Sequence, residues 1–126
     1  MRSLSGIQPS GRLHLGNYYG ALRQFLELQE RGEALYFLAD LHALTTVRDG
    51  TRLRTLTREA AGGYLALGLD PDRAVLFRQS DVPEVCELYW ILGTVVPLSN
   101  LERAHGYKDK LARGVPADLG CSPTRC

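Results

Sequence analysis

The decisive stretch of this 126-residue chain is Ser5-Gly6-Ile7-Gln8-Pro9-Ser10-Gly11-Arg12-Leu13-His14-Leu15-Gly16-Asn17-Tyr18. A short apolar start leads into a loop rich in glycine, proline and serine, and an amphipathic helical pattern follows directly. Such a junction directs backbone N–H groups and the positive end of a helix dipole at one place, where a phosphate can bind. Small residues in the loop let a bulky ligand approach the backbone closely. The stretch therefore predicts a nucleotide site at the start of the chain.

Hydrophobic periodicity over the rest of the chain alternates between strands and helices. The pattern predicts strands over residues 3–7, 34–39 and 74–77, helices over 15–31, 51–67 and 84–96, and a shorter helix over 99–106. This alternation is typical of an open parallel sheet with right-handed crossovers. We therefore predict an α/β fold, a Rossmann-like parallel sheet with flanking helices. Ligands of such sheets bind beyond the carboxyl ends of the strands, where the polar turns Asp40-Leu41-His42 and Gln79-Ser80-Asp81 would meet the opening loop.

The helix expected over residues 51–67 carries two further local signals. Thr51 is the expected N-cap, because a hydroxyl can accept a hydrogen bond from the first free amides of a helix. Gly62 and Gly63 lower the helix propensity, so we expect a backbone to pack closely against them.

Composition describes an ordinary soluble globular domain, with 44% hydrophobic and 23% charged residues. A formal net charge of +1 gives no global field to attract nucleic acid, so any such binding must use a local patch. No stretch approaches the roughly 20 apolar residues of a membrane span, and no secretory signal precedes the fold, so we expect a cytoplasmic protein with no membrane partner. The three cysteines argue against a disulfide framework, and their spacing predicts no metal site.

The residues His14-Leu15-Gly16-Asn17 carry the strongest local signal. His14 and Asn17 are three residues apart and would share a helix face, and Gly16 would leave room for an adenine or a ribose. From these residues alone, an equally weighted alternative is that His14 and Asn17 only cap the helix. Similarly, Lys110 and its basic neighbours taken alone are more typical of a solvated face, and His42 could be a satisfied turn residue.

The four residues His14-Leu15-Gly16-Asn17 resemble the first ATP-binding signature of class I aminoacyl-tRNA synthetases. The surrounding sequence is similar to the tryptophanyl branch in particular, in collinear order from residue 3 to about residue 120. The matching segments are Gly6-Ile7-Gln8-Pro9-Ser10-Gly11, Asp40-Leu41-His42-Ala43, Gly68-Leu69-Asp70-Pro71, Gln79-Ser80-Asp81-Val82-Pro83, Leu101-Glu102-Arg103 and Tyr107-Lys108-Asp109-Lys110.

The resemblance implies a ligase of protein biosynthesis that uses ATP to convert L-tryptophan to tryptophanyl-adenylate and transfers it to tRNA(Trp). Mg²⁺ would enter with ATP, and the family implies a homodimer, to which the helix containing Trp90 could contribute. The residues implied in ATP binding are Gln8, Pro9, Ser10, His14, Gly16, Asn17 and Lys110. Lys110, His14 and Asn17 are implied in catalysis, with Lys110 reaching the phosphates. Gly6, Ala39 and His42 would line the tryptophan pocket.

Two departures from the family pattern limit these expectations. Residues 1–120 read as a partial Rossmann-like catalytic domain, because the family's second ATP motif and its indole-recognising acidic residue have no match in this sequence. We therefore expect the chain alone to be catalytically incomplete. Residues 121–126 do not match the family, and their codons read one base earlier permit the family-like Phe-Ser-Tyr-Pro-Val, which predicts a frameshift.

Two other functions stay open at this level. One is a tyrosyl-type or related class I synthetase, which shares the fold but not the amino-acid sequence of the opening loop. The other is a non-catalytic module that binds ATP or a partner.

Overall fold

The computed structural model describes residues 1–97, 100 and 103. It divides into two compact units, Met1–Asp81 and Val82–Cys126, which are considered separately below. Lys110 and the tail over residues 121–126 lie outside the described residues, as does most of the helix expected over 99–106.

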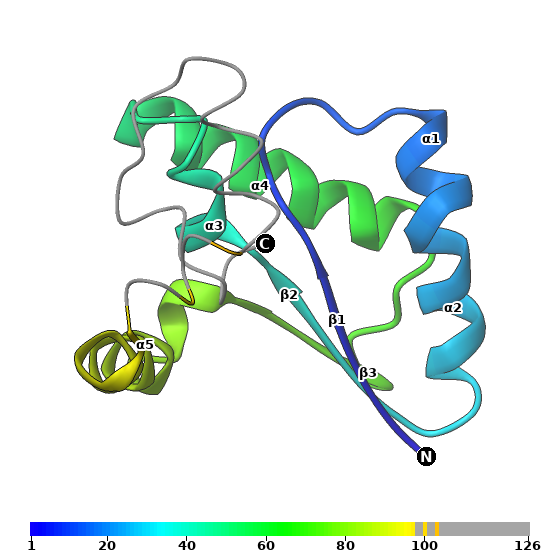
Figure 1. Cartoon of the computed structure of the whole chain (residues 1–126). Helices are drawn as coiled ribbons and strands as arrows, with labels where there is room; N and C mark the ends of the chain where they lie inside the picture. The colour runs from blue at the N-terminus through cyan, green and yellow to red at the C-terminus, as the bar shows by residue number, and fades with distance from the viewer. Residues whose placement is uncertain (98–99, 101–102, 104–126) are drawn as a thin grey trace. The chain divides into compact units, whose positions relative to one another are not determined.

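The first unit is built on a three-stranded parallel sheet in the order β1-β2-β3 (Figure 1). Its strands are β1 (Arg2–Ile7), β2 (Glu33–Leu38) and β3 (Ala74–Arg78). Ile7 pairs with Leu38, and Leu38 pairs with Arg78, so all three strands end at the same level. The predicted parallel α/β sheet is confirmed. The carboxyl ends of its three strands lie together along one edge of the sheet.

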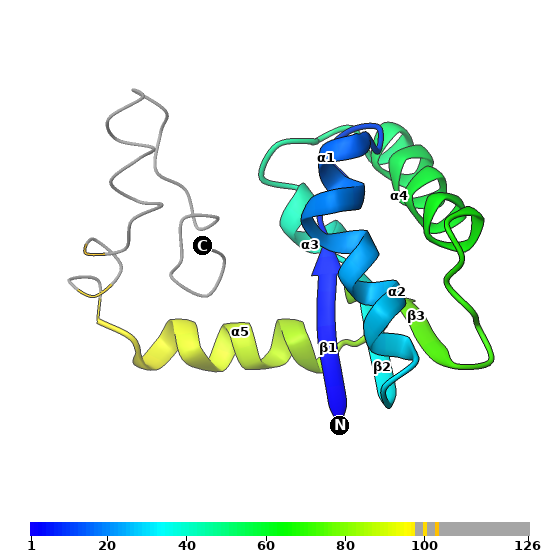
Figure 2. The same ribbon diagram turned by 90° about the vertical axis from the view of Figure 1, so that its right-hand side faces the viewer.

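The helix predicted over residues 15–31 is interrupted. It consists of α1 (Leu15–Asn17), the π-helical turn η1 (Tyr18–Leu22) and α2 (Arg23–Gln29), which Figure 2 shows as one helical column beside β1. The π turn is closed by the N–H of Arg23, which donates to the carbonyl of Tyr18 five residues earlier. The wider turn shifts the helical phase of the side chains between α1 and α2.

The polar turn after β2 forms a short helix, α3 (Asp40–Ala43), and a longer helix follows, α4 (Gly50–Ala66). The N-cap of α4 is Asp49, which corrects the prediction of Thr51. Asp49 has extended backbone, and its Oδ1 accepts from the N–H groups of Thr51 at 2.8 Å and Arg52 at 3.0 Å. A carboxylate one residue before the helix satisfies two free amides, while Thr51 already lies inside the helix. The polar turn after β3 is a 3-10 turn, η2 (Gln79–Asp81).

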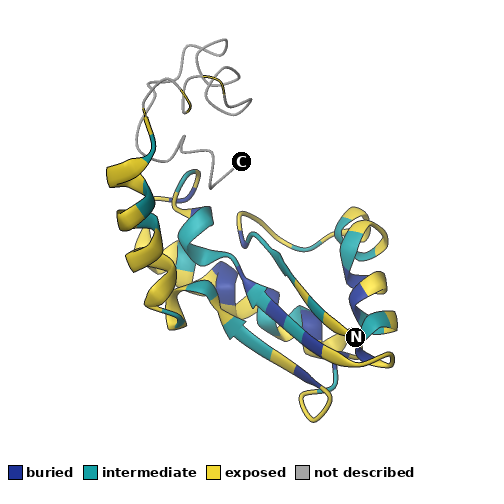
Figure 3. Cartoon of the chain, turned by 60° about the horizontal axis from the view of Figure 1, so that its bottom comes forward, coloured by how far each residue is buried: buried dark blue, intermediate teal, exposed yellow. Residues whose placement is uncertain are grey.

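The core lies on one face of the sheet, beneath α2 and α4. Tyr36 of β2 stacks on Phe25 of α2 with ring centroids 4.6 Å apart, and Phe25 stacks on Tyr64 of α4 at 6.1 Å. The hydroxyl of Tyr36 donates to the carbonyl of Phe25 at 2.8 Å. Figure 3 colours the residues by burial, and along β2 they alternate between buried and half-buried from Ala34 to Leu38. On the opposite face Leu4 and Val75 are 66% and 54% exposed.

The second unit contains α5 (Glu84–Val95), close to the predicted helix over 84–96, with Pro83 at the N-cap position. Trp90 on this helix is exposed. Among the residues described, no helix combines the length and apolar character needed to cross a membrane.

Candidate active site

The loop after β1 is anchored at both of its ends. Pro9 is fully buried, and the Nε2 of Gln8 donates to the Oγ1 of Thr46, just after α3, at 3.3 Å. At the far end Leu13 packs against the core and lies so close to Gly63 of α4 that an added Cβ there would overlap Leu13 Cδ1. The close approach is therefore made by a side chain and at Gly63 alone, since nothing lies within 4 Å of a Cβ added at Gly62, and this corrects the prediction of a backbone packed against the pair. Between the anchors, Ser10 is exposed.

His14 and Asn17 form a reciprocal cap at the start of α1. The Nδ1 of His14 accepts from the N–H of Gly16 at 3.1 Å, and the Oδ1 of Asn17 accepts from the N–H of His14 at 3.0 Å. His14 has extended backbone and precedes the helix, so the two residues do not share a helical face as predicted. The capping alternative is therefore correct as a description of the local geometry. An Nδ1 acceptor requires the Nε2–H tautomer, which leaves Nε2–H as a donor.

The end of β2 presents the residues predicted for the amino-acid pocket. Ala39 extends the ladder, because its N–H donates to the carbonyl of Ile7 at 2.9 Å. His42 follows on α3, and its N–H donates to Oε1 of Gln79 at 3.3 Å. Gly6 pairs with Phe37 across the sheet, and an added Cβ would lie 2.6 Å from the Phe37 carbonyl oxygen and 2.8 Å from its ring. Strand alternation places Gly6, Phe37 and Ala39 on the face opposite the core.

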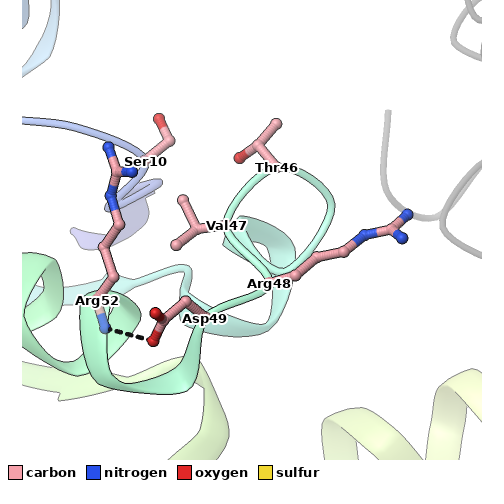
Figure 4. Close-up of a pocket in the computed structure, with 6 residues that line it drawn as sticks. All are labelled: Ser10, Thr46, Val47, Arg48, Asp49 and Arg52. Carbon is pink, nitrogen blue, oxygen red and sulfur yellow. Dashed lines mark hydrogen bonds between the residues drawn. The ribbon is translucent and has the colours of Figure 1, made fainter.

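A cavity of about 200 Å³ lies beside the loop. Its lining residues are Ser10, Thr46, Val47, Arg48, Asp49 and Arg52 (Figure 4). Figure 4 shows the Arg52 side chain extending toward Ser10, whereas Arg48 points away from it. The backbone N–H groups of Arg52 and Thr51 hold the pKa of the Asp49 carboxyl below its ordinary value, so Asp49 stays ionised as the cap of α4.

The structure thus brings two groups of the predicted residues to one edge of the sheet. Gln8, Pro9 and Ser10 follow β1, while Ala39 and His42 follow β2 at the same level. His14, Gly16 and Asn17 are hydrogen-bonded to one another and not to the residues after β2. Lys110 lies outside the described residues. Within the described part of the chain, no three His, Cys, Asp or Glu side chains form a group able to hold a metal ion.

Two residues beside the site were not singled out from the sequence, Thr46 and the cap Asp49. Asp40 and Ser80 lie in the polar turns expected at the ends of their strands. Asp40 and Ser80 are linked across the sheet edge, with Oδ2 of Asp40 accepting from the hydroxyl of Ser80 at 2.5 Å. Their position in polar turns directly after strands was the available signal. Nothing in the local sequence marks Thr46 as the partner of Gln8, which is 38 residues away.

Comparison with known proteins gives a consistent assignment. The family described as tRNA synthetases class I (W and Y) matches residues 1–118. The tryptophan–tRNA ligase of Rhodopirellula baltica is 59% identical over 120 residues, and that of Campylobacter jejuni is 50% identical over 120 residues. Each alignment covers 95% of this chain and 38% of the relative, so the chain spans about two fifths of the length of these proteins.

Similarity to solved structures supports the same family assignment. The crystal structure of Campylobacter jejuni tryptophanyl-tRNA synthetase complexed with ADP and tryptophan has a TM-score of 0.86 and 50% identity, covering 96% of this chain and 38% of that one. A tyrosyl-tRNA synthetase from Archaeoglobus fulgidus has a TM-score of 0.74 at 22% identity, with 98% and 40% covered, which shows a shared fold. The chain therefore belongs to the class I tRNA synthetase family of the W and Y enzymes.

Proposed function

We propose that the chain supplies part of a tryptophan–tRNA ligase, in which ATP activates tryptophan to tryptophanyl-adenylate before transfer to tRNA(Trp). The observation that carries this proposal is that Gln8, Pro9 and Ser10 follow β1 at the same edge of the sheet where Ala39 and His42 follow β2. The capped His14-Leu15-Gly16-Asn17 turn lies at the far end of that loop. The carboxylate of tryptophan attacks the α-phosphorus of ATP, and pyrophosphate leaves. ATP and tryptophan must therefore bind next to each other. The carboxyl ends of β1 and β2 are level, so ATP would bind after β1 and tryptophan after β2.

The ATP side consists of the loop after β1 and the first turn of α1. Gln8, Pro9, Ser10 and Gly16 would bring backbone and small side chains close to the nucleotide. The Nε2–H of His14 and the Nδ2 of Asn17 remain as donors, because their cap uses His14 Nδ1 and Asn17 Oδ1. Donors held in this way can stabilise negative charge that develops on the phosphates. Lys110 would add a positive charge there.

The amino-acid side consists of Gly6, Ala39 and His42. The absence of a side chain at Gly6 lets the Phe37 ring lie directly against the β1 backbone, because an added Cβ would be 2.8 Å from that ring. An apolar ring and a small alanine are suitable neighbours for an indole, and the imidazole of His42 supplies a polar group.

Mg²⁺ would enter with ATP. This ion usually keeps several waters and binds through one or two carboxylates together with substrate phosphates, so a dedicated protein cage is not required. When bound, it would neutralise charge on the polyphosphate. We also propose a cytoplasmic homodimer, for which the exposed Trp90 of α5 is a candidate contact.

Because the chain spans about two fifths of its relatives, we propose that residues 1–120 bind ligands but form adenylate poorly alone. A non-catalytic ATP-binding module is the second candidate, favoured by that same coverage. The test is calorimetric titration of the 126-residue chain with ATP, with and without tryptophan, together with tryptophan-dependent pyrophosphate exchange. Coupled binding of both ligands supports the ligase site, binding of ATP alone supports the module, and absence of ATP binding contradicts both.

The matched variants are Asn17→Asp and Asn17→Ala. Asp retains an oxygen that can accept from the N–H of His14, so the cap survives while the Nδ2 donor is replaced by a negative charge. If Asn17 contacts ATP, Asn17→Asp weakens ATP binding while the unfolding midpoint stays near that of the unsubstituted chain. If Asn17 only caps α1, Asn17→Asp binds ATP normally and only Asn17→Ala is affected.

A further inference from the structure

The carboxyl ends of β2 and β3 are tied together by the carboxylate of Asp40. Its Oδ1 accepts from the N–H of Leu41 at 3.0 Å and from the N–H of Ser80 at 3.0 Å. Its Oδ2 accepts from the hydroxyl of Ser80 at 2.5 Å. One carboxylate therefore binds three donors, two of which come from η2, 40 residues further along the chain.

A second hydrogen bond joins the same two segments, with the acceptor now on η2, at Gln79, and the donor on α3. The Oε1 of Gln79 accepts from the N–H of His42, which lies in the first turn of α3. The first amides of a helix have no partner inside the helix, and a four-residue helix has little stability of its own. The amides of Leu41 and His42 are bound by Asp40 and Gln79, so α3 depends on these two side chains.

The backbone just before α3 is fixed from the other neighbouring strand. The N–H of Ala39 donates to Ile7 of β1, and its φ of −78° and ψ of 62° are close to those of an inverse γ-turn at a strand end. Ala43 is fully buried and donates to the carbonyl of Ala39 at 2.9 Å. Ala39 and His42 thus sit on a segment held by β1 on one side and by η2 on the other.

We propose that Asp40 and Gln79 are positioning residues for the amino-acid side of the site. They fix Ala39 and His42 by binding the first turn of α3 to η2. This inference rests on the proposed function, in which Ala39 and His42 face tryptophan. The caps that hold His14, Gly16 and Asn17 use neither residue, so loss of the tie weakens tryptophan binding far more than ATP binding.

A matched control exists within the same 3-10 turn. Asp81 binds Arg78, with Oδ2 accepting from the backbone N–H of Arg78 at 3.0 Å and Oδ1 accepting from its Nε at 3.0 Å. These bonds span three residues and do not reach β2. The Arg78 guanidinium and amide hold the pKa of the Asp81 carboxyl below its ordinary value. Asp81→Asn therefore perturbs η2 without breaking the tie to α3.

The experiment compares Gln79→Leu, Gln79→Glu and Asp81→Asn in the 126-residue chain. Leu removes the acceptor, whereas Glu keeps an oxygen for the N–H of His42. Amide hydrogen exchange of His42 is measured by NMR without ligand, and dissociation constants for tryptophan and ATP are measured by calorimetry. We expect Gln79→Leu to speed His42 exchange and to weaken tryptophan binding by about tenfold, with ATP binding changed by less than about threefold. Gln79→Glu should restore most of the tryptophan affinity, and Asp81→Asn should resemble the unsubstituted chain.

The outcomes separate this inference from the proposed function. If the unsubstituted chain binds neither ligand, the proposed function is wrong and the inference falls with it. If it binds tryptophan and Gln79→Leu binds it as tightly as Asp81→Asn does, only the inference is overturned. Equal loss of ATP and tryptophan binding in Gln79→Leu would also overturn it, because that result indicates general unfolding. The amide exchange of Ala34 and Tyr36 in buried β2 reports such unfolding independently.

Discussion

The two faces of the sheet use alternate residues of the same three strands and differ in what covers them. On one face Ala34, Tyr36 and Leu38 are buried under α2 and α4. On the other face Phe37 and Phe77 lie with ring centroids 5.8 Å apart, and Leu4 and Val75 remain more than half exposed.

This difference assigns separate roles to the two faces. The covered face supplies the apolar burial that stabilises the fold, because buried area is the dominant favourable term in folding. The second face carries Gly6 and leads at its carboxyl end to Ala39, the residues proposed for the amino-acid pocket. Substitutions on the first face should therefore change stability, whereas exposed positions on the second should tolerate change.

The largest expected effect on stability is on the covered face, at Tyr36. Tyr36→Ala removes a fully buried ring that stacks on Phe25, and should lower the free energy of unfolding by about 3–5 kcal/mol. Urea unfolding followed by circular dichroism measures this loss. Val75→Ala is the control, because Val75 is exposed on the other face, and its cost should stay within about 0.5 kcal/mol. Similar losses in the two variants would contradict the assignment of the faces.

A smaller effect is expected where the second face is tightly packed, at Gly6. Gly6→Ala places a Cβ 2.6 Å from the Phe37 carbonyl oxygen, which belongs to the sheet backbone and cannot easily move. We expect a loss of about 1–3 kcal/mol from overpacking. Gly11→Ala is the control, since nothing lies within 4 Å of a Cβ there. An unchanged unfolding midpoint in Gly6→Ala would contradict overpacking against the Phe37 backbone.

The next comparison lies within the covered face, between its two buried tyrosines. Tyr36→Phe loses the hydrogen bond to the Phe25 carbonyl and should cost about 1–2 kcal/mol. The Tyr64 hydroxyl is buried without a hydrogen-bond partner among the described residues, so Tyr64→Phe should be neutral or stabilising by up to about 1 kcal/mol. Urea unfolding of the two variants measures the difference. Equal costs would reveal a partner for Tyr64.

Burial also raises the pKa of Tyr64 above its ordinary value. A group with a raised pKa in the folded state stabilises the fold below its unfolded pKa of about 10, and this contribution is lost as the pH rises beyond that value. Tyr64→Phe should therefore make the loss of stability above about pH 10 less steep. An unchanged alkaline profile would contradict this cause.

The sheet could be predicted from the sequence because its signals are local. A continuous apolar run predicted β2, and shorter apolar segments predicted β1 and β3, each to within one residue at either end. Alternation with helical patterns predicted that the strands are parallel. The π turn at Tyr18–Leu22 escaped prediction because an amphipathic pattern tolerates one wider turn. Thr51 and Asp49 are both good caps, and the choice depends on where the backbone leaves the extended conformation.

The candidate site also contains residues that a local sequence pattern predicts and contacts that no local pattern predicts. His14 and Asn17 were found because their relation is contained in four residues, although their geometry is a cap and not a shared face. The partners Gln8–Thr46, His42–Gln79 and Asp40–Ser80 are separated by 37 to 40 residues. Their bonds exist only once the crossovers bring the strand ends together, so no local pattern could show them.

The smallest expected effect concerns the neighbouring glycines of α4. Gly62→Ala meets nothing within 4 Å and should raise stability by up to about 1 kcal/mol through helix propensity. Gly63→Ala gains the same propensity but displaces Leu13, so its net change in stability should be close to zero. Urea unfolding and ATP titration of both variants measure these changes. Because Leu13 immediately precedes the cap at His14, only Gly63→Ala should weaken ATP binding. If both variants bind ATP equally, packing on α4 does not position the loop, and the covered face serves the fold alone.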